Sequence, residues 1–133
     1  MARSLGLTAA ACLGALLLVG ASGAQDAERP EILNVAFPER LTAGQPATVR
    51  ITFRAPRGNV VAVIQILEDL DGARRVTSQR EVSVVAAAFG FEEGDLLLPI
   101  EFATPGRKRV VFSLLTDERQ ESDRERMYIE VAP

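Results

Sequence analysis

Apolar and polar residues alternate in short runs along the chain after residue 30. The clearest run is Ala47–Arg54, in which Ala47, Val49, Ile51 and Phe53 should point one way and the intervening threonines and arginines the other. A period of two is typical of a β-strand with one buried and one solvated face. No sustained helical period accompanies these runs, so the chain after residue 30 is predicted to be all-β.

Seven runs of this kind are predicted as strands, separated by turns rich in glycine, proline and aspartate. The fourth is the least defined, because it begins near Arg74–Thr77 or is confined to Glu81–Ala87. Seven short strands in about a hundred residues predict a seven-stranded antiparallel immunoglobulin-like β-sandwich over residues 31–133. The other six strands are expected at Ile32–Phe37, Ala47–Arg54, Val60–Glu68, Asp95–Phe102, Arg107–Leu115 and Arg126–Val131.

Two local signals refine this arrangement. Pro99 lies in the fifth predicted strand, on the phase opposite to its leucines, and lacks a backbone N–H, so this strand is expected at a sheet edge. Asp71 and Gly72 follow the third predicted strand. They predict a hairpin turn, because this dipeptide readily adopts the positive φ values of a hairpin.

The third and sixth predicted strands are apolar on both phases. They are normally neighbours in one sheet of this fold, and a two-layer sandwich buries only one face of a sheet. We therefore expect an exposed apolar strip that binds another protein or a second copy of the chain through the outer face of the third, sixth and seventh strands. The alternative is that loops or the N-terminal tail cover the strip, or that strand twist splits it. The expected members are Val61, Val63, Leu67, Val111 and Leu115.

The N-terminal segment has the three parts of a secretory signal peptide. Arg3 makes its start positive, and residues 5–20 are nearly all apolar. Ser22 and Ala24 then place small residues where signal peptidase requires them, which predicts cleavage between Ala24 and Gln25.

Residues 1–24 are thus predicted to be a signal peptide and residues 25–30 a polar lead-in, which makes the mature protein secreted or periplasmic. An uncleaved membrane anchor is the alternative, since the segment reaches the minimum length for a span. A lipoprotein is disfavoured, because Cys12 lies inside the apolar run instead of after it.

Composition excludes several kinds of chemistry. The chain has no histidine, and its one cysteine is Cys12. This removes the usual zinc and copper sites, Cys–His nucleophiles and Ser-His-Asp triads. No nucleophile-elbow, P-loop or dinucleotide motif occurs. The net charge of −3 is spread in mixed order along the chain, so nucleic acid is not an expected partner. We expect a protein that is not an enzyme and has no cofactor.

Asp69 and Asp71 suggest one alternative function, a calcium- or carbohydrate-binding domain. Asp-x-Asp-Gly resembles the opening of a calcium loop, but the closing glutamate of an EF-hand loop would fall at position 80, which is Arg80. A looser site would need ligands from another loop. The preferred interpretation is a plain hairpin turn, for which Asp-Gly is sufficient.

Two stretches resemble bacterial extracytoplasmic immunoglobulin-like modules of the CARDB-like group. Ala43–Phe53 is similar to their glycine turn and second strand, and Thr104–Gly106 to their proline-glycine corner before the sixth strand. Lys108 stands near the place where many such domains have a corner tyrosine. The resemblance implies the sandwich fold and carries over no functional residue. We therefore expect a binding or assembly module that acts through protein–protein contact.

Overall fold

The computed structural model describes residues 29–133. The predicted signal peptide and its cleavage site between Ala24 and Gln25 lie outside these residues. Residues 29–133 contain no apolar helix of membrane-spanning length. The strands are β1 (Glu31–Ala36), β2 (Ala47–Arg54), β3 (Val60–Leu70), β4 (Val76–Val85), β5 (Glu93–Ile100), β6 (Gly106–Thr116) and β7 (Glu125–Val131).

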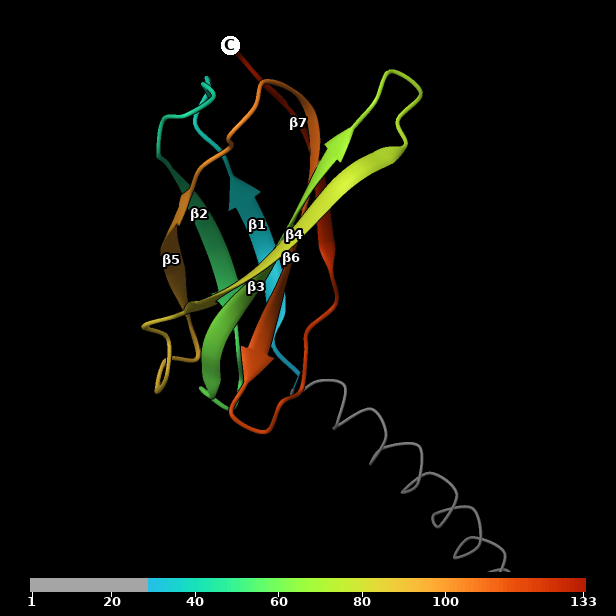
Figure 1. The fold of residues 1–133 in the computed structure, drawn as a ribbon. Coiled ribbons are helices and arrows are strands. Elements are labelled where there is room, and N and C mark those ends of the chain that lie inside the picture. The colour runs from blue at the N-terminus through green and yellow to red at the C-terminus, as the bar shows by residue number, and fades with distance from the viewer. Residues whose placement is uncertain (1–28) are drawn as a thin grey trace, which may run out of the picture.

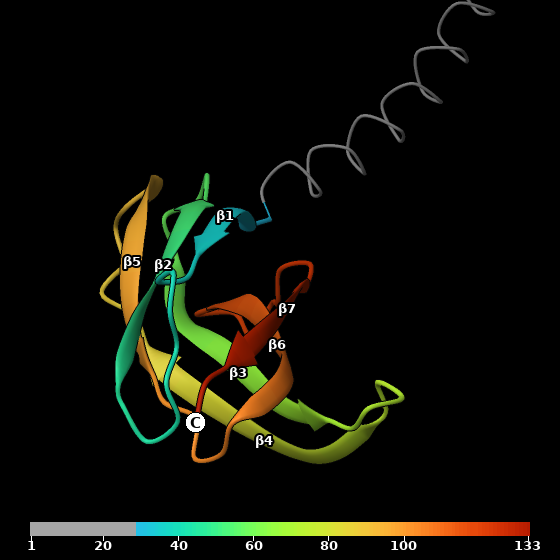
Figure 2. The same cartoon turned by 90° about the horizontal axis from the view of Figure 1, so that it is seen from above.

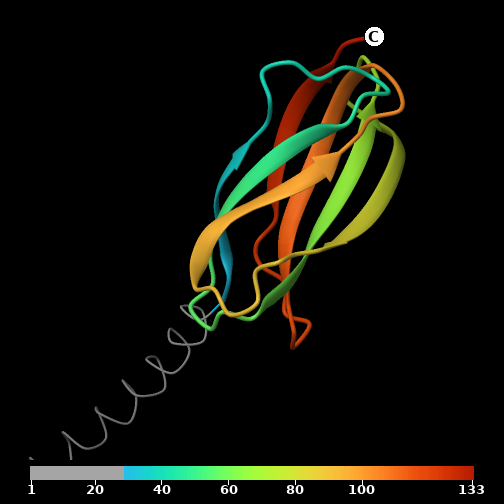
Figure 3. The ribbon, with the colours of Figure 1, turned by 90° about the vertical axis from the view of Figure 1, so that its left-hand side faces the viewer.

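The seven strands form two sheets that pack face to face (Figure 1, Figure 2). One sheet has the order β1-β2-β5 and the other the order β4-β3-β6-β7. Every pair of neighbouring strands is antiparallel. Figure 3 shows the three-stranded sheet in front of the four-stranded one. The predicted seven-stranded immunoglobulin-like sandwich is confirmed.

The core lies between the sheets and takes alternate residues from their strands. In β2, Val49 and Ile51 are fully buried while Thr48 and Arg50 are exposed, as the period of two predicts. Each fully buried aliphatic or phenyl side chain stabilises the fold by about 1.5–3 kcal/mol. The central core residues are Val49, Ile51, Phe53, Leu96, Leu98, Ile100, Val110, Phe112 and Leu114.

Strand β5 lies at the edge of its sheet, with β2 as its one neighbour there. Pro99 is exposed and pairs in register with Thr48. An edge strand tolerates proline because one side of the strand has no ladder of hydrogen bonds to lose. The edge position predicted from Pro99 is confirmed.

The β3–β4 hairpin turns at Asp71, as predicted, but its positive φ falls on another residue. Arg74 has φ of 62°, whereas Gly72 is not in the left-handed region. The Asp71 carboxylate accepts hydrogen bonds from the backbone N–H groups of Ala73 and Arg75, at 2.8 and 2.9 Å. Aspartate is favoured at the first position of a turn for this reason. The hairpin places the whole of β4 beside β3.

One phase prediction for β3 is wrong. Val63 and Leu67 belong to the core, with 0% and 9% of their surface exposed, so they are not part of an outward-facing strip. The register shifts between Val60 and Ala62, a β-bulge that lets both Val60 and Val63 face inward. The polar Gln65 lies on the same inward phase and is 2% exposed. The sequence was ambiguous because both phases of residues 60–67 are apolar apart from this glutamine.

Candidate functional site

The outer face of the four-stranded sheet is directed away from the three-stranded sheet and carries apolar residues from three strands. Val111 and Leu115 of β6 lie on this face, because Val110, Phe112 and Leu114 face the core. The β3 residues on the outer face are those of the phase opposite to Val63 and Leu67. They are Ala62, Ile64 and Ile66.

The centre of the outer face is already covered in the monomer. Ile66 and Val111 pair in register and are 6% and 5% exposed. Glu81 of β4 stands opposite Ile66, and Arg126 of β7 opposite Val111. Long charged side chains cover apolar neighbours with their methylene stems while their charged ends stay in water. This row therefore offers little apolar surface to a partner.

Apolar surface is exposed at one end of the same face. Val85, Ala62 and Leu115 lie side by side across β4, β3 and β6 and are called the end row here. Val85 is 87% exposed, Leu115 is half-buried and Ala62 between them is 7% exposed, so Val85 supplies most of the exposed surface of the row. Val61, which was also expected in the strip, sits at the bulge, and its carbonyl accepts a hydrogen bond from Ala86 at 3.0 Å. Whether this surface binds a partner stays a prediction.

An ion pair borders the outer face further along the sheet. Arg109 of β6 donates two hydrogen bonds to Glu68 of β3, one of them at 3.0 Å. Glu68 is 6% exposed. The bonds from Arg109 to Glu68, and after them its contact with Tyr128, raise the pKa of the guanidinium above its already high ordinary value. Arg109 thus stays charged at every ordinary pH.

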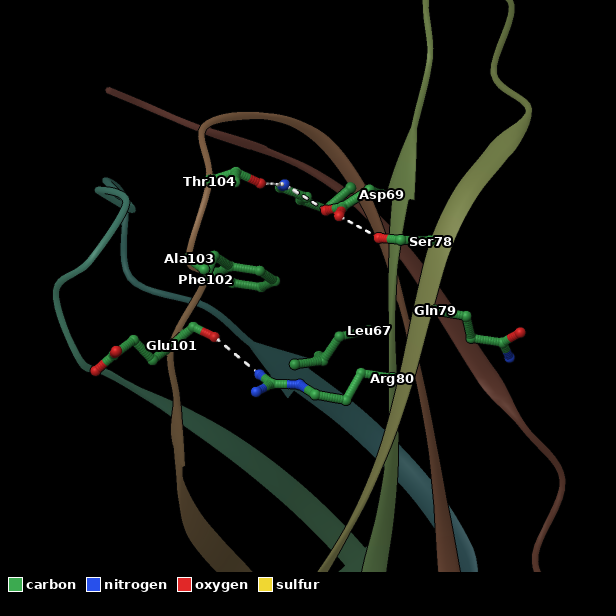
Figure 4. A pocket seen from close by; sticks show the side chains of 10 residues that line it. Leu67, Asp69, Ser78, Gln79, Arg80, Glu101, Phe102, Ala103 and Thr104 are labelled. Carbon is green, nitrogen blue, oxygen red and sulfur yellow. Dashed lines mark hydrogen bonds and ion pairs between the residues drawn. The ribbon is translucent and has the colours of Figure 1, made fainter.

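A pocket lies at the end of the molecule that contains the β3–β4 hairpin, called the hairpin end, and is lined by β3, β4, β6 and the β5–β6 connection (Figure 4). Its volume is about 240 Å³, and the ammonium group of Lys108 lies in its wall. Lys108 is 3% exposed and donates to Asp69 and, at 2.7 Å, to Thr104. Ser78 donates to the other Asp69 oxygen. Hydrogen bonds from Lys108 and Ser78 lower the pKa of Asp69.

The polar groups of this pocket satisfy one another. A buried ammonium is costly unless it is paired and hydrogen-bonded, and Asp69 and Thr104 supply those partners to Lys108. Figure 4 also shows Arg80 donating to the backbone carbonyl of Glu101, at 3.4 Å. This arrangement ties β3, β4 and β6 to the β5–β6 connection.

The two aspartates of the calcium alternative are engaged separately. Asp69 binds Lys108 and Ser78, while Asp71 holds its own turn. Within residues 29–133 no group of three or more acidic, cysteine or histidine residues is placed to hold a metal ion. The hairpin turn alone accounts for Asp71.

Sequence reasoning missed an aromatic loop between β4 and β5. Phe89 and Phe91 are 62% and 59% exposed, which is unusual for phenyl side chains. The loop is fixed by hydrogen bonds, among them Gly90 N–H to the Gly58 carbonyl at 2.7 Å and Phe91 N–H to the Ala88 carbonyl at 3.1 Å. Two phenylalanines around a glycine, outside any period-two run, were the available signal. The end of the molecule that contains this loop and the end row is called the aromatic end.

Comparison with known proteins supports the fold alone. No protein-family model matches the chain, and no curated protein matches it in sequence. Among solved structures, OgpA from Akkermansia muciniphila is similar with a TM-score of 0.55 and 14% identity over 77% of this chain. The chain spans 28% of the length of OgpA.

A second similar structure is a separate domain. The PKD domain of an M14-like peptidase from a Thermoplasmatales archaeon has a TM-score of 0.50 and 13% identity, covering 79% of this chain and 94% of that domain. The chain is therefore an immunoglobulin-like β-sandwich module. The CARDB-like assignment stays a prediction.

Proposed function

We propose that this chain is a non-enzymatic binding or assembly module that acts outside the cytoplasm. It engages another protein through the end row of Val85, Ala62 and Leu115 on the outer face of the four-stranded sheet. The three-part N-terminal segment of the sequence supports an extracytoplasmic location. The absence of histidine from the whole sequence supports a role without catalysis.

The observation that carries the proposal is the exposure of Val85. A valine that is 87% exposed stands in register with Ala62, which in turn stands beside Leu115. An exposed apolar side chain beside further apolar residues is a common feature of protein contact surfaces, because its burial against a partner removes it from water. Ile64, half-buried on the same face, extends the row toward the covered centre.

The test uses a photo-crosslinking amino acid at position 83 in the full chain, expressed in cells that make it naturally. Ser83 is exposed and pairs in register with Ile64, next to the end row. A crosslinked adduct is expected, and Val85→Glu should abolish it. The matched control is Val76→Glu, the same substitution at the other end of β4, where the valine is 42% exposed.

Two results would contradict the proposal. One is the lack of any adduct at position 83 together with a monomeric chain by light scattering. The other is an adduct that persists in Val85→Glu as strongly as in Val76→Glu. An adduct between two copies of this chain would identify self-assembly as the contact.

A further inference from the structure

A second surface feature lies at the edge of the three-stranded sheet, away from the outer face. It is a groove of about 320 Å³ beside Phe91. Phe53, Phe91 and Leu96 make its apolar walls, and Glu93 and Asp95 stand at its rim. Leu96 faces the core whereas Glu93 and Asp95 are exposed, so the groove crosses the free edge of β5.

The groove is open because residue 94 is glycine. A Cβ atom at Gly94 would lie 3.6 Å from Cε1 of Phe53, an ordinary van der Waals contact. Gly94 does not have a positive φ, so the backbone does not require glycine here. An alanine at this position would therefore fit the fold and narrow the groove. This gives a substitution that changes the groove and leaves the strand intact.

The carboxylates around the groove are not neutralised by ion pairs, although Oδ1 of Asp95 accepts a hydrogen bond from the Thr52 hydroxyl at 2.6 Å. Among the ion pairs of residues 29–133, none includes Glu92, Glu93 or Asp95. Arg54 is the register neighbour of Glu93 but pairs with Glu31 instead. An apolar groove with carboxylates at its rim complements a side chain that has an apolar stem and a cationic end. A guanidinium can also pack over the face of a phenyl ring such as that of Phe91.

The edge of β5 adds a backbone contribution. β5 has β2 on one side, and in residues 29–133 no strand pairs with its other side. The unpaired N–H and C=O groups of such an edge can bind an extended chain, which adds as a further strand. Pro99 ends the usable edge, because it has no N–H to donate.

We propose that the groove beside Phe91 binds an arginine or lysine side chain of an extended segment of a partner protein, with the segment adding to the free edge of β5. The Phe53, Phe91 and Leu96 side chains contact the apolar stem, and the carboxylates of Glu93 and Asp95 bind the cationic end. This site lies on a different sheet from the end row. The two contacts can therefore be tested independently of each other.

The test measures fluorescence anisotropy of a labelled peptide bound to the full chain. The probe is an alternating valine-threonine heptapeptide with a central arginine, and its matched control carries citrulline, which has nearly the same shape but no charge. The arginine peptide should bind about fivefold more tightly than the citrulline peptide, as expected for one cation at an exposed aromatic site. Added salt should reduce this difference.

Paired variants locate the site. Phe91→Ala, Gly94→Ala and the double variant Glu93→Gln/Asp95→Asn should each weaken arginine-peptide binding about fivefold. Phe89→Ala and Glu92→Gln are matched controls, since neither residue lines the groove, and should leave binding unchanged. All of these variants should give the same circular dichroism spectrum and thermal melt as the unmodified chain. For the two phenylalanine variants this is expected because Phe89 and Phe91 are similarly exposed.

Several results would overturn the proposal. One is equal affinity for the arginine and citrulline peptides, and another is the lack of saturable binding up to about 1 mM peptide. A third is a loss of binding in Phe89→Ala equal to that in Phe91→Ala. Dimerisation that depends on Phe91 would assign the groove to a second copy instead. Binding to phosphatidylglycerol vesicles that depends on Phe91 would assign it to a bilayer.

Discussion

The two ends of the sandwich differ in the burial of their unusual side chains. At the hairpin end, a buried ammonium meets a carboxylate and a hydroxyl, so Lys108, Asp69 and Thr104 satisfy one another. At the aromatic end, Val85, Phe89 and Phe91 are exposed to water. A buried charge has to be paired within the fold, whereas exposed apolar surface costs the fold little and is available to a partner. The hairpin end therefore serves stability, and the aromatic end is where we expect recognition.

The largest expected effect comes from breaking the hairpin end. Asp69→Ala leaves the ammonium of Lys108 buried without its carboxylate, and we expect it to lower the free energy of unfolding by about 2–3 kcal/mol, since water reaches this site in part. The double variant Asp69→Ala/Lys108→Met should recover most of that loss. Urea unfolding followed by circular dichroism measures both, and a double variant no more stable than the single one would contradict the account of this pair.

The next effect concerns the rigidity of the aromatic end. Gly58 has φ of 57°, and a Cβ there would lie 3.4 Å from the carbonyl carbon of Gly90. Gly58→Ala should therefore cost about 1–2 kcal/mol and loosen the loop that presents Phe91. Hydrogen exchange at the Gly90 and Phe91 amides should speed up in this variant. Gly94→Ala is the control, because a Cβ there would make similar van der Waals contact but the backbone has no positive φ.

A smaller effect should appear as a pH dependence of the hairpin end. Hydrogen bonds lower the pKa of Asp69 below its ordinary value of 3.8. The stability from this carboxylate is present above that value and is lost as pH falls through the lower pKa of the folded state. The unfolding free energy should thus show no pH dependence from Asp69 between pH 5 and pH 7, where its contribution is fully present, but a loss of stability below about pH 4. Asp69→Asn should reduce this loss of stability at acid pH. An unchanged loss in that variant would contradict the role of the carboxylate.

The smallest effects on stability are expected at the aromatic end. Val85→Glu and Phe91→Ala should each change the free energy of unfolding by less than about 0.5 kcal/mol, because both side chains are mostly exposed. The same substitutions should have the largest effects on partner binding. Thermal melts beside the crosslinking and peptide assays would test this separation. A large loss of stability in either variant would show that its side chain contributes to the stability of the fold.

Much of the fold was predictable because it depends on local signals. The alternation of Val49, Ile51 and Phe53, the edge position of Pro99 and the turn at Asp71 follow from strand periodicity and turn chemistry, which act over a few residues. The candidate site was less predictable. Phe91 and Gly94 belong to no periodic run, and the groove arises only when a loop, a strand edge and a core phenyl come together.

The sequence by itself determined that the chain forms seven strands in an aliphatic and phenyl sandwich. Only the tertiary structure decided that Val63 and Leu67 face the core. Residues 60–67 are apolar on both phases apart from Gln65, so periodicity leaves the two faces of this part of β3 nearly equivalent. The bulge before Ala62 and the pairing with β6 select the buried face.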